Sequence, residues 1–143
     1  FVSHTFFWGD WHREETLGRE RAMRISPTRS ATERGIRYTL HNDPPVVPPD
    51  MIRTLWSATT RRTRSGQVLG AEQRASLQEA LAGITLDAAR QYGEDSLKGS
   101  ITPGKQADFV IVDQDPLAMD PEHLLQLRVL ETISRGKTVF LAP

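Results

Sequence analysis

Several residues in the first third of the chain carry side chains that could bind a metal ion or move a proton. They are His4, Asp10, His12, His41 and Asp43. Each lies at or near the end of a predicted strand, and in parallel α/β folds the carboxyl ends of the strands face the loops that bind substrate. This placement makes the five residues candidates for a site, without assigning a role to any of them.

Asp43 is the strongest single candidate, because it follows a predicted strand and directly precedes the proline-rich segment 44–50. Four of the seven residues in that segment are proline, so we expect a stiff, extended loop that holds the carboxylate in one place. Two interpretations remain open. Asp43 is a metal ligand, or either Asp43 or Asn42 makes a side-chain turn to backbone amides ahead of Pro44. On the local sequence alone the turn is favoured.

The residues near Asp43 and at the start of the chain allow two interpretations each. His41 precedes Asp43 by two positions, so in an extended strand the two side chains share a face and could form a ligand pair. A zinc site needs at least three protein ligands, which leaves the pair incomplete. His4 is either a core histidine bonded to backbone or a pocket residue. Trp8 and Trp11 either line a substrate cleft or cover the rim of the fold.

The elements that must position these residues follow from hydrophobic periodicity and turn residues. We expect a strand over 1–8, helical segments over 16–25, 28–34 and 51–63, a strand over 36–41, a helical pair over 76–92, a strand over 107–113, a short helix over 121–127 and two strands within 129–141. Ser76 with Glu79 predicts a capping box, and Gly35 predicts a left-handed helix end. The spacing of the first two strands favours a parallel crossover unit.

Composition limits the classes of function. The 143 residues include eighteen basic and eighteen acidic side chains and no cysteine. Balanced charge gives no field that draws nucleic acid or an anionic membrane, and we expect the arginines at 61, 62 and 64 to form a solvated helix end. Without cysteine, any metal must bind through His and carboxylate. No apolar stretch approaches the roughly 20 residues that span a bilayer, so the sequence predicts a soluble, cytoplasmic protein.

Longer motifs carry a resemblance to a known family. These motifs are Trp8-Gly9-Asp10, Arg29-Ser30-Ala31, Thr39-Leu40-His41-Asn42-Asp43, Leu55-Trp56-Ser57-Ala58, Pro103-Gly104-Lys105-Gln106-Ala107-Asp108-Phe109 and Gly136-Lys137-Thr138-Val139. With them the chain resembles the carboxyl-terminal third of amidohydrolase family 3, which includes N-substituted formamide deformylases. The resemblance implies an α/β fold: the last strands and helices of a (β/α)8 metal-dependent hydrolase barrel over 1–93, and part of a small β-sandwich domain over 94–143. A full barrel needs on the order of 250 residues, so we expect a fragment that is inactive alone.

The resemblance also implies roles for the candidate residues. In the family, the last barrel strand ends in an aspartate that binds the catalytic metal and handles the proton of the attacking water, and Asp43 matches it, which reverses the local preference for a turn. His4, Trp8 and His41 would lie near the substrate at the barrel mouth. The implied cofactor is a divalent metal, expected to be zinc, in the full-length enzyme. The implied substrate is a small molecule with an amide or formamide carbon–nitrogen bond.

The remaining expectations concern partners. The implied partner is the remainder of the enzyme's own barrel, with homo-oligomers left open. The alternative is a non-catalytic α/β module, derived from such an enzyme, that binds a ligand or partner. The apolar run 1–8 favours the fragment, because an independent module is not expected to begin in the middle of a strand.

Overall fold

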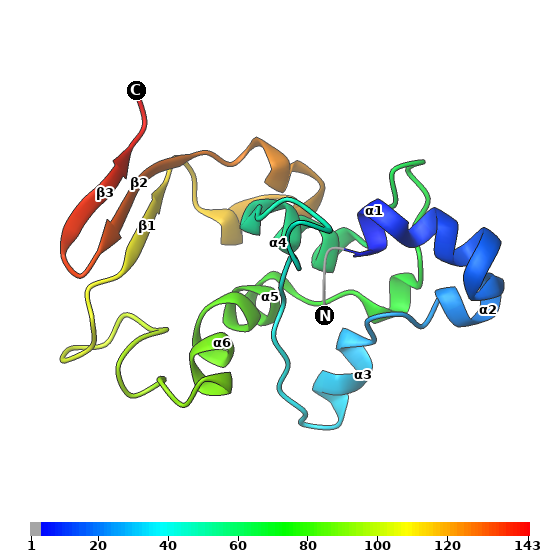
Figure 1. Ribbon diagram of the computed structural model, residues 1–143, viewed down its shortest axis with the longest axis horizontal. Helices are drawn as coiled ribbons and strands as arrows, with labels where there is room; N and C mark the ends of the chain where they lie inside the picture. The colour runs from blue at the N-terminus through cyan, green and yellow to red at the C-terminus, as the bar shows by residue number, and fades with distance from the viewer. Residues whose placement is uncertain (1–3) are drawn as a thin grey trace.

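The computed structural model describes residues 4–143, with helices in the first two thirds of the chain and strands in the last third (Figure 1). The α-helices are α1 (His4–Trp11), α2 (Gly18–Ala22), α3 (Thr28–Glu33), α4 (Met51–Thr60), α5 (Leu77–Ile84) and α6 (Leu86–Gln91). A π-helical segment, η1 (His12–Thr16), follows α1, and the 3₁₀ segments are η2 (Ala71–Gln73), η3 (Pro116–Ala118) and η4 (Pro121–Gln126). The strands are β1 (Phe109–Val112), β2 (Val129–Ser134) and β3 (Lys137–Leu141). Within residues 4–143, no helix is both long and apolar enough to cross a membrane.

The three strands form one antiparallel sheet in the order β1-β2-β3. Thr132 in the central strand lies opposite Val110 on one side and Phe140 on the other. β2 and β3 form a hairpin around Arg135 and Gly136, whose φ angles of 50° and 74° are both left-handed. Tight two-residue hairpin turns favour that conformation. The predicted strand within 107–113 and the predicted hairpin are therefore confirmed.

The strand predicted over 1–8 is wrong from residue 4 onward, because His4–Trp11 is the helix α1; residues 1–3 lie outside the described part of the chain. A short apolar run such as Phe6-Phe7-Trp8 does not distinguish a buried strand from a helix by its pattern. A helix satisfies its backbone hydrogen bonds within its own segment, whereas a parallel strand needs a neighbouring strand. Because residues 4–11 form no strand ladder in the structure, the helix is the conformation that satisfies their backbone hydrogen bonds.

The strand predicted over 36–41 is also not formed as a ladder. Residues 36–40 are extended without strand pairing, and His41 makes a single-residue bridge. The segment instead lies against α5, where the Leu40 N–H donates to the Gly83 carbonyl at 3.1 Å. Among residues 4–143, this segment therefore pairs with α5 at Leu40 rather than with a neighbouring strand.

The helix predictions from local signals are confirmed. Ser76 and Glu79 form the predicted capping box of α5, in which each side chain accepts the other residue's backbone N–H. α3 ends before Gly35, which has the expected left-handed φ of 66°. α4 ends at Thr60, earlier than predicted, because Arg61 adopts a left-handed φ of 57°. α2 is shorter than the predicted segment 16–25.

The hydrophobic core lies between α4, α5, η4 and the extended segment before Asp43. Its buried members are Leu40, Leu55, Trp56, Ala75, Leu77, Ala80 and Leu124. Phe6 of α1 packs against Trp56 of α4 with their rings edge to face and the centroids 5.4 Å apart. Leu124 is fully buried although it follows β1 in the sequence. The chain thus leaves the helices for the sheet, returns to them through η4 and ends in the sheet.

Arg61 is not part of a solvated helix end, as the sequence predicted, but is buried with 2% of its surface exposed. Its guanidinium donates to three carbonyls: Nε to Leu69 at 2.5 Å, Nη1 to Ser26 at 3.0 Å and Nη2 to Ile25 at 2.6 Å. Burial lowers the pKa of Arg61 to about 10, so the group remains cationic at neutral pH. The left-handed turn at Arg61 places its side chain between two loops distant in sequence.

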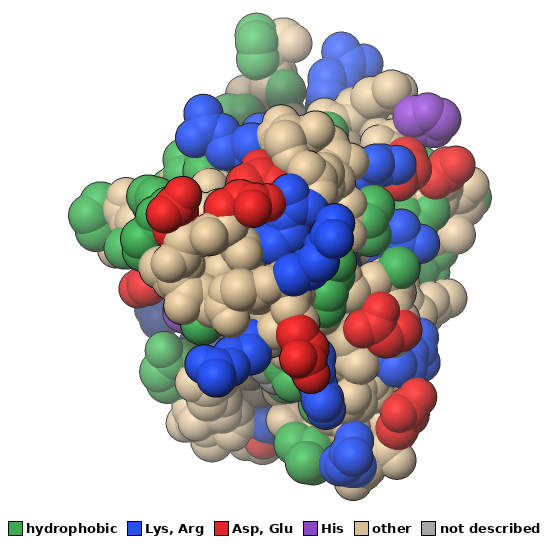
Figure 2. All heavy atoms as spheres, turned by 90° about the vertical axis from the view of Figure 1, so that its right-hand side faces the viewer, with side chains coloured by type: hydrophobic (Ala, Val, Ile, Leu, Met, Phe, Trp, Pro, Cys, Tyr) green, Lys and Arg blue, Asp and Glu red, His purple; other side chains and the backbone are tan. Residues whose placement is uncertain are grey.

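The other two arginines of the cluster behave as predicted. Arg62 is partly exposed and pairs with Glu122 at 2.7 Å, and Arg64 is exposed. On the face shown in Figure 2, basic and acidic side chains are interspersed. The prediction of a solvated cluster therefore holds for Arg62 and Arg64 and fails for Arg61.

Candidate metal and substrate site around Asp43

The backbone around Asp43 is held by its buried neighbour, Asn42. The Thr54 hydroxyl of α4 donates to Asn42 Oδ1 at 2.5 Å, and Asn42 Nδ2 lies 3.0 Å from the sulfur of Met51. These contacts attach the end of the extended segment to the first turn of α4. They were not predicted, because Asn42 and Thr54 are twelve positions apart and their contact depends on how α4 packs against the segment before Asp43.

Asp43 itself is exposed and begins a tight turn. Its φ is 56°, and its carbonyl accepts the Val46 N–H at 2.9 Å. The local sequence favoured a turn closed by a side chain, whereas the turn at Asp43 is closed by this backbone hydrogen bond. The carboxylate of Asp43 consequently lies on the surface of a rigid turn, where it is available to a ligand.

His41 and Asp43 lie on either side of buried Asn42, and both are exposed. The left-handed φ of Asp43 ends the extended geometry at this point, so the prediction that the two side chains share a face stays a prediction. Partial burial lowers the pKa of His41, although the nearby negative charge of Asp43 acts in the opposite direction. The lowered pKa favours the neutral imidazole, which is the form that binds metal ions.

The candidates on α1 separate into two groups. Trp8 is 41% exposed and stacks edge to face on Trp11, with the ring centroids 6.2 Å apart. Asp10 accepts hydrogen bonds from the Ser65 N–H at 3.1 Å and the Ser65 hydroxyl at 2.7 Å. Partial burial would raise the pKa of Asp10, but these hydrogen bonds outweigh it and lower the pKa. Asp10 thus fastens α1 to the loop after α4, whereas Trp8 is available to a ligand.

Two further histidines complete the predicted set. His4 is the first residue of α1, and its side chain lies outside the described part of the structure. The ring of His12 is 5.4 Å from that of Trp11, and His12 Nδ1 is 3.1 Å from the Thr16 hydroxyl. His12 therefore contacts residues of α1 and η1.

The donors around Asp43 have the chemistry of a zinc site but not the number. Zinc binds carboxylate oxygen and imidazole nitrogen, as Asp43 and His41 offer, and needs at least three protein ligands. Within the described residues, no group of three or more His, Cys, Asp or Glu side chains is placed to hold a metal ion. Any metal held here would require further ligands from outside the described set.

Two cavities within the described part of the chain lie away from Asp43. A cavity of about 10 Å³, lined by Thr5, Thr28, Thr54, Ser57 and Arg61 with their neighbours, is large enough for a water molecule only. A cleft of about 290 Å³ is lined by residues of the 32–38 segment and of α5 and α6. Neither is lined by His41, Asp43 or Trp8.

Comparison with known proteins shows which family the sequence matches. A model of the amidohydrolase family matches residues 1–140. The chain is 30% identical over 135 residues to the N-substituted formamide deformylase of Arthrobacter pascens. The aligned region covers 92% of this chain and 24% of that protein. The chain spans about a quarter of the length of the curated relatives it matches.

Two solved structures resemble the fold of this chain. An uncharacterized metal-dependent hydrolase from Pyrococcus horikoshii OT3 superimposes with a TM-score of 0.68 at 26% identity, over 85% of this chain and 25% of that one. The 5-methylcytosine deaminase from Klebsiella pneumoniae superimposes with a TM-score of 0.62 over 92% of this chain and 30% of that one; at 19% identity this likeness shows the fold alone. With a family model matched along almost its whole length, the chain belongs to the amidohydrolase family.

Proposed function

We propose that the chain is the carboxyl-terminal portion of a metal-dependent hydrolase that cleaves an amide- or formamide-type carbon–nitrogen bond. Residues 1–93 would complete a (β/α)8 barrel, and residues 94–143 would complete a small β-sandwich. The likeness to N-substituted formamide deformylase along 92% of the chain supports the bond type, and the quarter share of that protein's length supports the status of a portion. The geometry that carries the proposal is the exposed carboxylate of Asp43 on its rigid turn.

In the proposed reaction, Asp43 binds the metal and moves the proton. A bound zinc ion would lower the pKa of a water molecule towards 7, which allows that water to act as a nucleophile at neutral pH. The Asp43 carboxylate accepts the proton of the attacking water and returns it to the departing amine. The anchored backbone at Asn42 and the turn to Val46 support this role, because proton transfer needs a carboxylate held in one position.

His4, Trp8 and His41 are proposed to contact the substrate. The exposed imidazole of His41, two residues before Asp43, supports its place at the site. The exposed indole of Trp8, in a pair with Trp11, offers a flat apolar surface on α1. The small amide- or formamide-type substrate and the remaining metal ligands would meet these residues in the full-length enzyme.

The experiment is metal analysis and an amide- and formamide-hydrolysis screen on the full-length protein, with Asp43→Asn compared to wild type. We expect at least one zinc per chain and a loss of at least about 100-fold in kcat/KM in the variant, the usual minimum for removing an acid–base group. The matched control is Asp50→Asn in the same loop, because Asn caps α4 as well as Asp does. Equal activity in wild type and Asp43→Asn would contradict the assignment, and the absence of both metal and hydrolysis would favour the non-catalytic module.

A further inference from the structure

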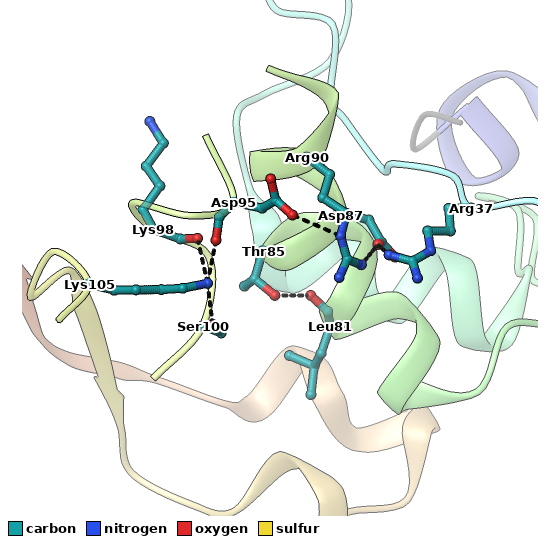
Figure 3. A network of polar contacts seen from close by, with 9 residues as sticks. All are labelled: Arg37, Leu81, Thr85, Asp87, Arg90, Asp95, Lys98, Ser100 and Lys105. Atoms are coloured by element: carbon teal, nitrogen blue, oxygen red, sulfur yellow. Dashed lines mark hydrogen bonds and ion pairs between the residues drawn. The ribbon is translucent and has the colours of Figure 1, made fainter. Parts of the chain in front are cut away.

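Lys105 lies in the loop that connects the helices to the sheet, between α6 and β1, and its side chain turns back into that loop (Figure 3). The ammonium donates to the Asp95 carbonyl, to the Ser100 hydroxyl at 2.7 Å and to the Lys98 carbonyl at 3.5 Å. A lysine ammonium has three N–H donors, so these three oxygens match its full donor capacity. The loop therefore presents a small oxygen-lined site that its own lysine fills.

The shape of this site suits a primary ammonium rather than a guanidinium. Two backbone carbonyls and one hydroxyl surround a single nitrogen, whereas Arg presents five donors spread over a planar fork. The acceptors are neutral oxygens rather than carboxylates. The Lys105 ammonium is thus bound by the dipoles of neutral carbonyl and hydroxyl groups, and its binding depends on the position of the loop backbone.

The same loop is pressed against the helices at Gly99. A Cβ atom built at Gly99 would lie 2.7 Å from the Cβ of Ala89 in α6 and 3.1 Å from the Thr85 carbonyl, and the φ of Gly99 is 91°. The backbone therefore touches the α5–α6 junction directly. On its other side, the loop is closed by the Gln106 N–H, which donates to the Leu97 carbonyl at 2.8 Å just before β1 begins.

Ion pairs extend from the site to the segment that carries Asp43. The Asp95 carboxylate accepts from Arg90 Nε at 3.1 Å, and Arg90 Nη1 is 3.0 Å from Asp87 (Figure 3). Asp87 is in turn 3.8 Å from Arg37, at the start of the extended segment. A continuous set of polar contacts thus connects that segment, α6 and the loop before β1.

We infer that the loop 94–106 is built as a binding site for a primary ammonium ion, that Lys105 occupies it, and that this occupancy fixes the sheet on the helices. The sheet has two connections to the helices: this loop, and the segment 113–128, which is held by the buried Leu124. Without the ammonium, the carbonyls of Asp95 and Lys98 would lose their partner and the first connection would loosen. The role is independent of metal binding and of hydrolysis.

The first test uses the three lysines of the sequence, Lys98, Lys105 and Lys137, in the full-length protein. Trace acetylation followed by mass spectrometry compares their rates in one sample. Lys98 has 43% of its side chain exposed and Lys137 is exposed, so both serve as internal controls. We expect Lys105 to react at least tenfold more slowly than either. Equal rates would overturn the inference.

The second test compares Lys105→Ala with the matched control Lys98→Ala by amide hydrogen exchange. We expect faster exchange at Gln106 in Lys105→Ala only, because the Lys98 side chain makes just a surface ion pair with Glu94. Adding propylammonium should restore protection at Gln106, and tetramethylammonium, which has no N–H donor, should not. Unchanged exchange in Lys105→Ala, or a loss that propylammonium does not reverse, would overturn the ammonium site.

Discussion

The helices and the sheet of this chain are stabilised in different ways. The helical region, taken as residues 4–91 with η4, buries a continuous apolar core and also a cationic side chain, Arg61, on three carbonyls. The sheet β1–β3 buries little: every residue of β3 is exposed, and Val139 is 64% exposed. The helices hold together through contacts between distant segments, whereas the sheet depends on its hydrogen-bond ladder and its two connections.

Many apolar side chains of the sheet are not covered by other parts of the described chain. Exposed members include Val110, Ile111, Leu130, Val139, Phe140 and Leu141. Consecutive residues of a strand point to opposite faces, so both faces of the sheet carry exposed apolar side chains, and a three-stranded sheet needs a packed face for independent stability. In the proposed enzyme, the remainder of the β-sandwich would supply that face.

The largest expected effect is in the helical region, at Arg61. Replacing it by methionine, Arg61→Met, leaves the carbonyls of Ile25, Ser26 and Leu69 buried without their donor. We expect a loss of about 3–5 kcal/mol in the free energy of unfolding, measured by denaturant titration. Arg64→Met, in the same arginine cluster but exposed, should leave it unchanged. Similar losses in both variants would show that the buried contacts of Arg61 do not contribute more to the stability of the helical region than an exposed arginine does.

A second substitution tests whether η4 belongs with the helices. Leu124 is fully buried in the core, so Leu124→Ala should cost about 3 kcal/mol, within the range for large-to-small core substitutions. The neighbouring Leu125 is 42% exposed, and Leu125→Ala should cost much less. Thermal or denaturant unfolding of both variants gives the answer. Equal losses of stability in the two variants would show that η4 is not packed into the helical core.

The smallest expected effect is on the sheet. In residues 1–143 alone, Val139→Thr should change the free energy of unfolding by less than about 0.5 kcal/mol, because exposed positions tolerate substitution and Thr suits a strand. In the full-length protein, a covering layer would raise the cost to about 1 kcal/mol. A large loss in the short chain would show that this face is already packed, and would end the contrast with the helices.

Local signals predicted the elements that local contacts stabilise. The capping box of Ser76 and Glu79 and the hairpin at Arg135-Gly136 depend on residues within a few positions of each other. Segments 1–8 and 36–41 were predicted as strands from their composition, but a strand also needs a neighbour, and composition does not supply one. The burial of Arg61 depends on carbonyls up to 36 positions away, which no local pattern contains.

The candidate site shows the same limit. Alternation along an extended segment predicted that His41 and Asp43 share a face; both are exposed, but Asp43 adopts a left-handed φ, so the shared face stays a prediction. The contact of Asn42 with Thr54 was not predicted, because it depends on how α4 packs. The roles of Asp43, His41, His4 and Trp8 in catalysis and binding stay predictions, which the Asp43→Asn comparison begins to test.

The carbonyl contacts of Arg61 also set an order of events during synthesis. Ile25 and Ser26 leave the ribosome 36 and 35 residues before Arg61 does, and the third acceptor, Leu69, follows 8 residues later. Until Arg61 has emerged, the loop at 25–26 lacks its cation, and until residue 69 has emerged, Arg61 lacks its third acceptor. The segment with α1, α2 and α3 therefore waits, incompletely closed, for a later part of the chain, and a nascent chain stalled before residue 61 would present these helices to chaperones or proteases.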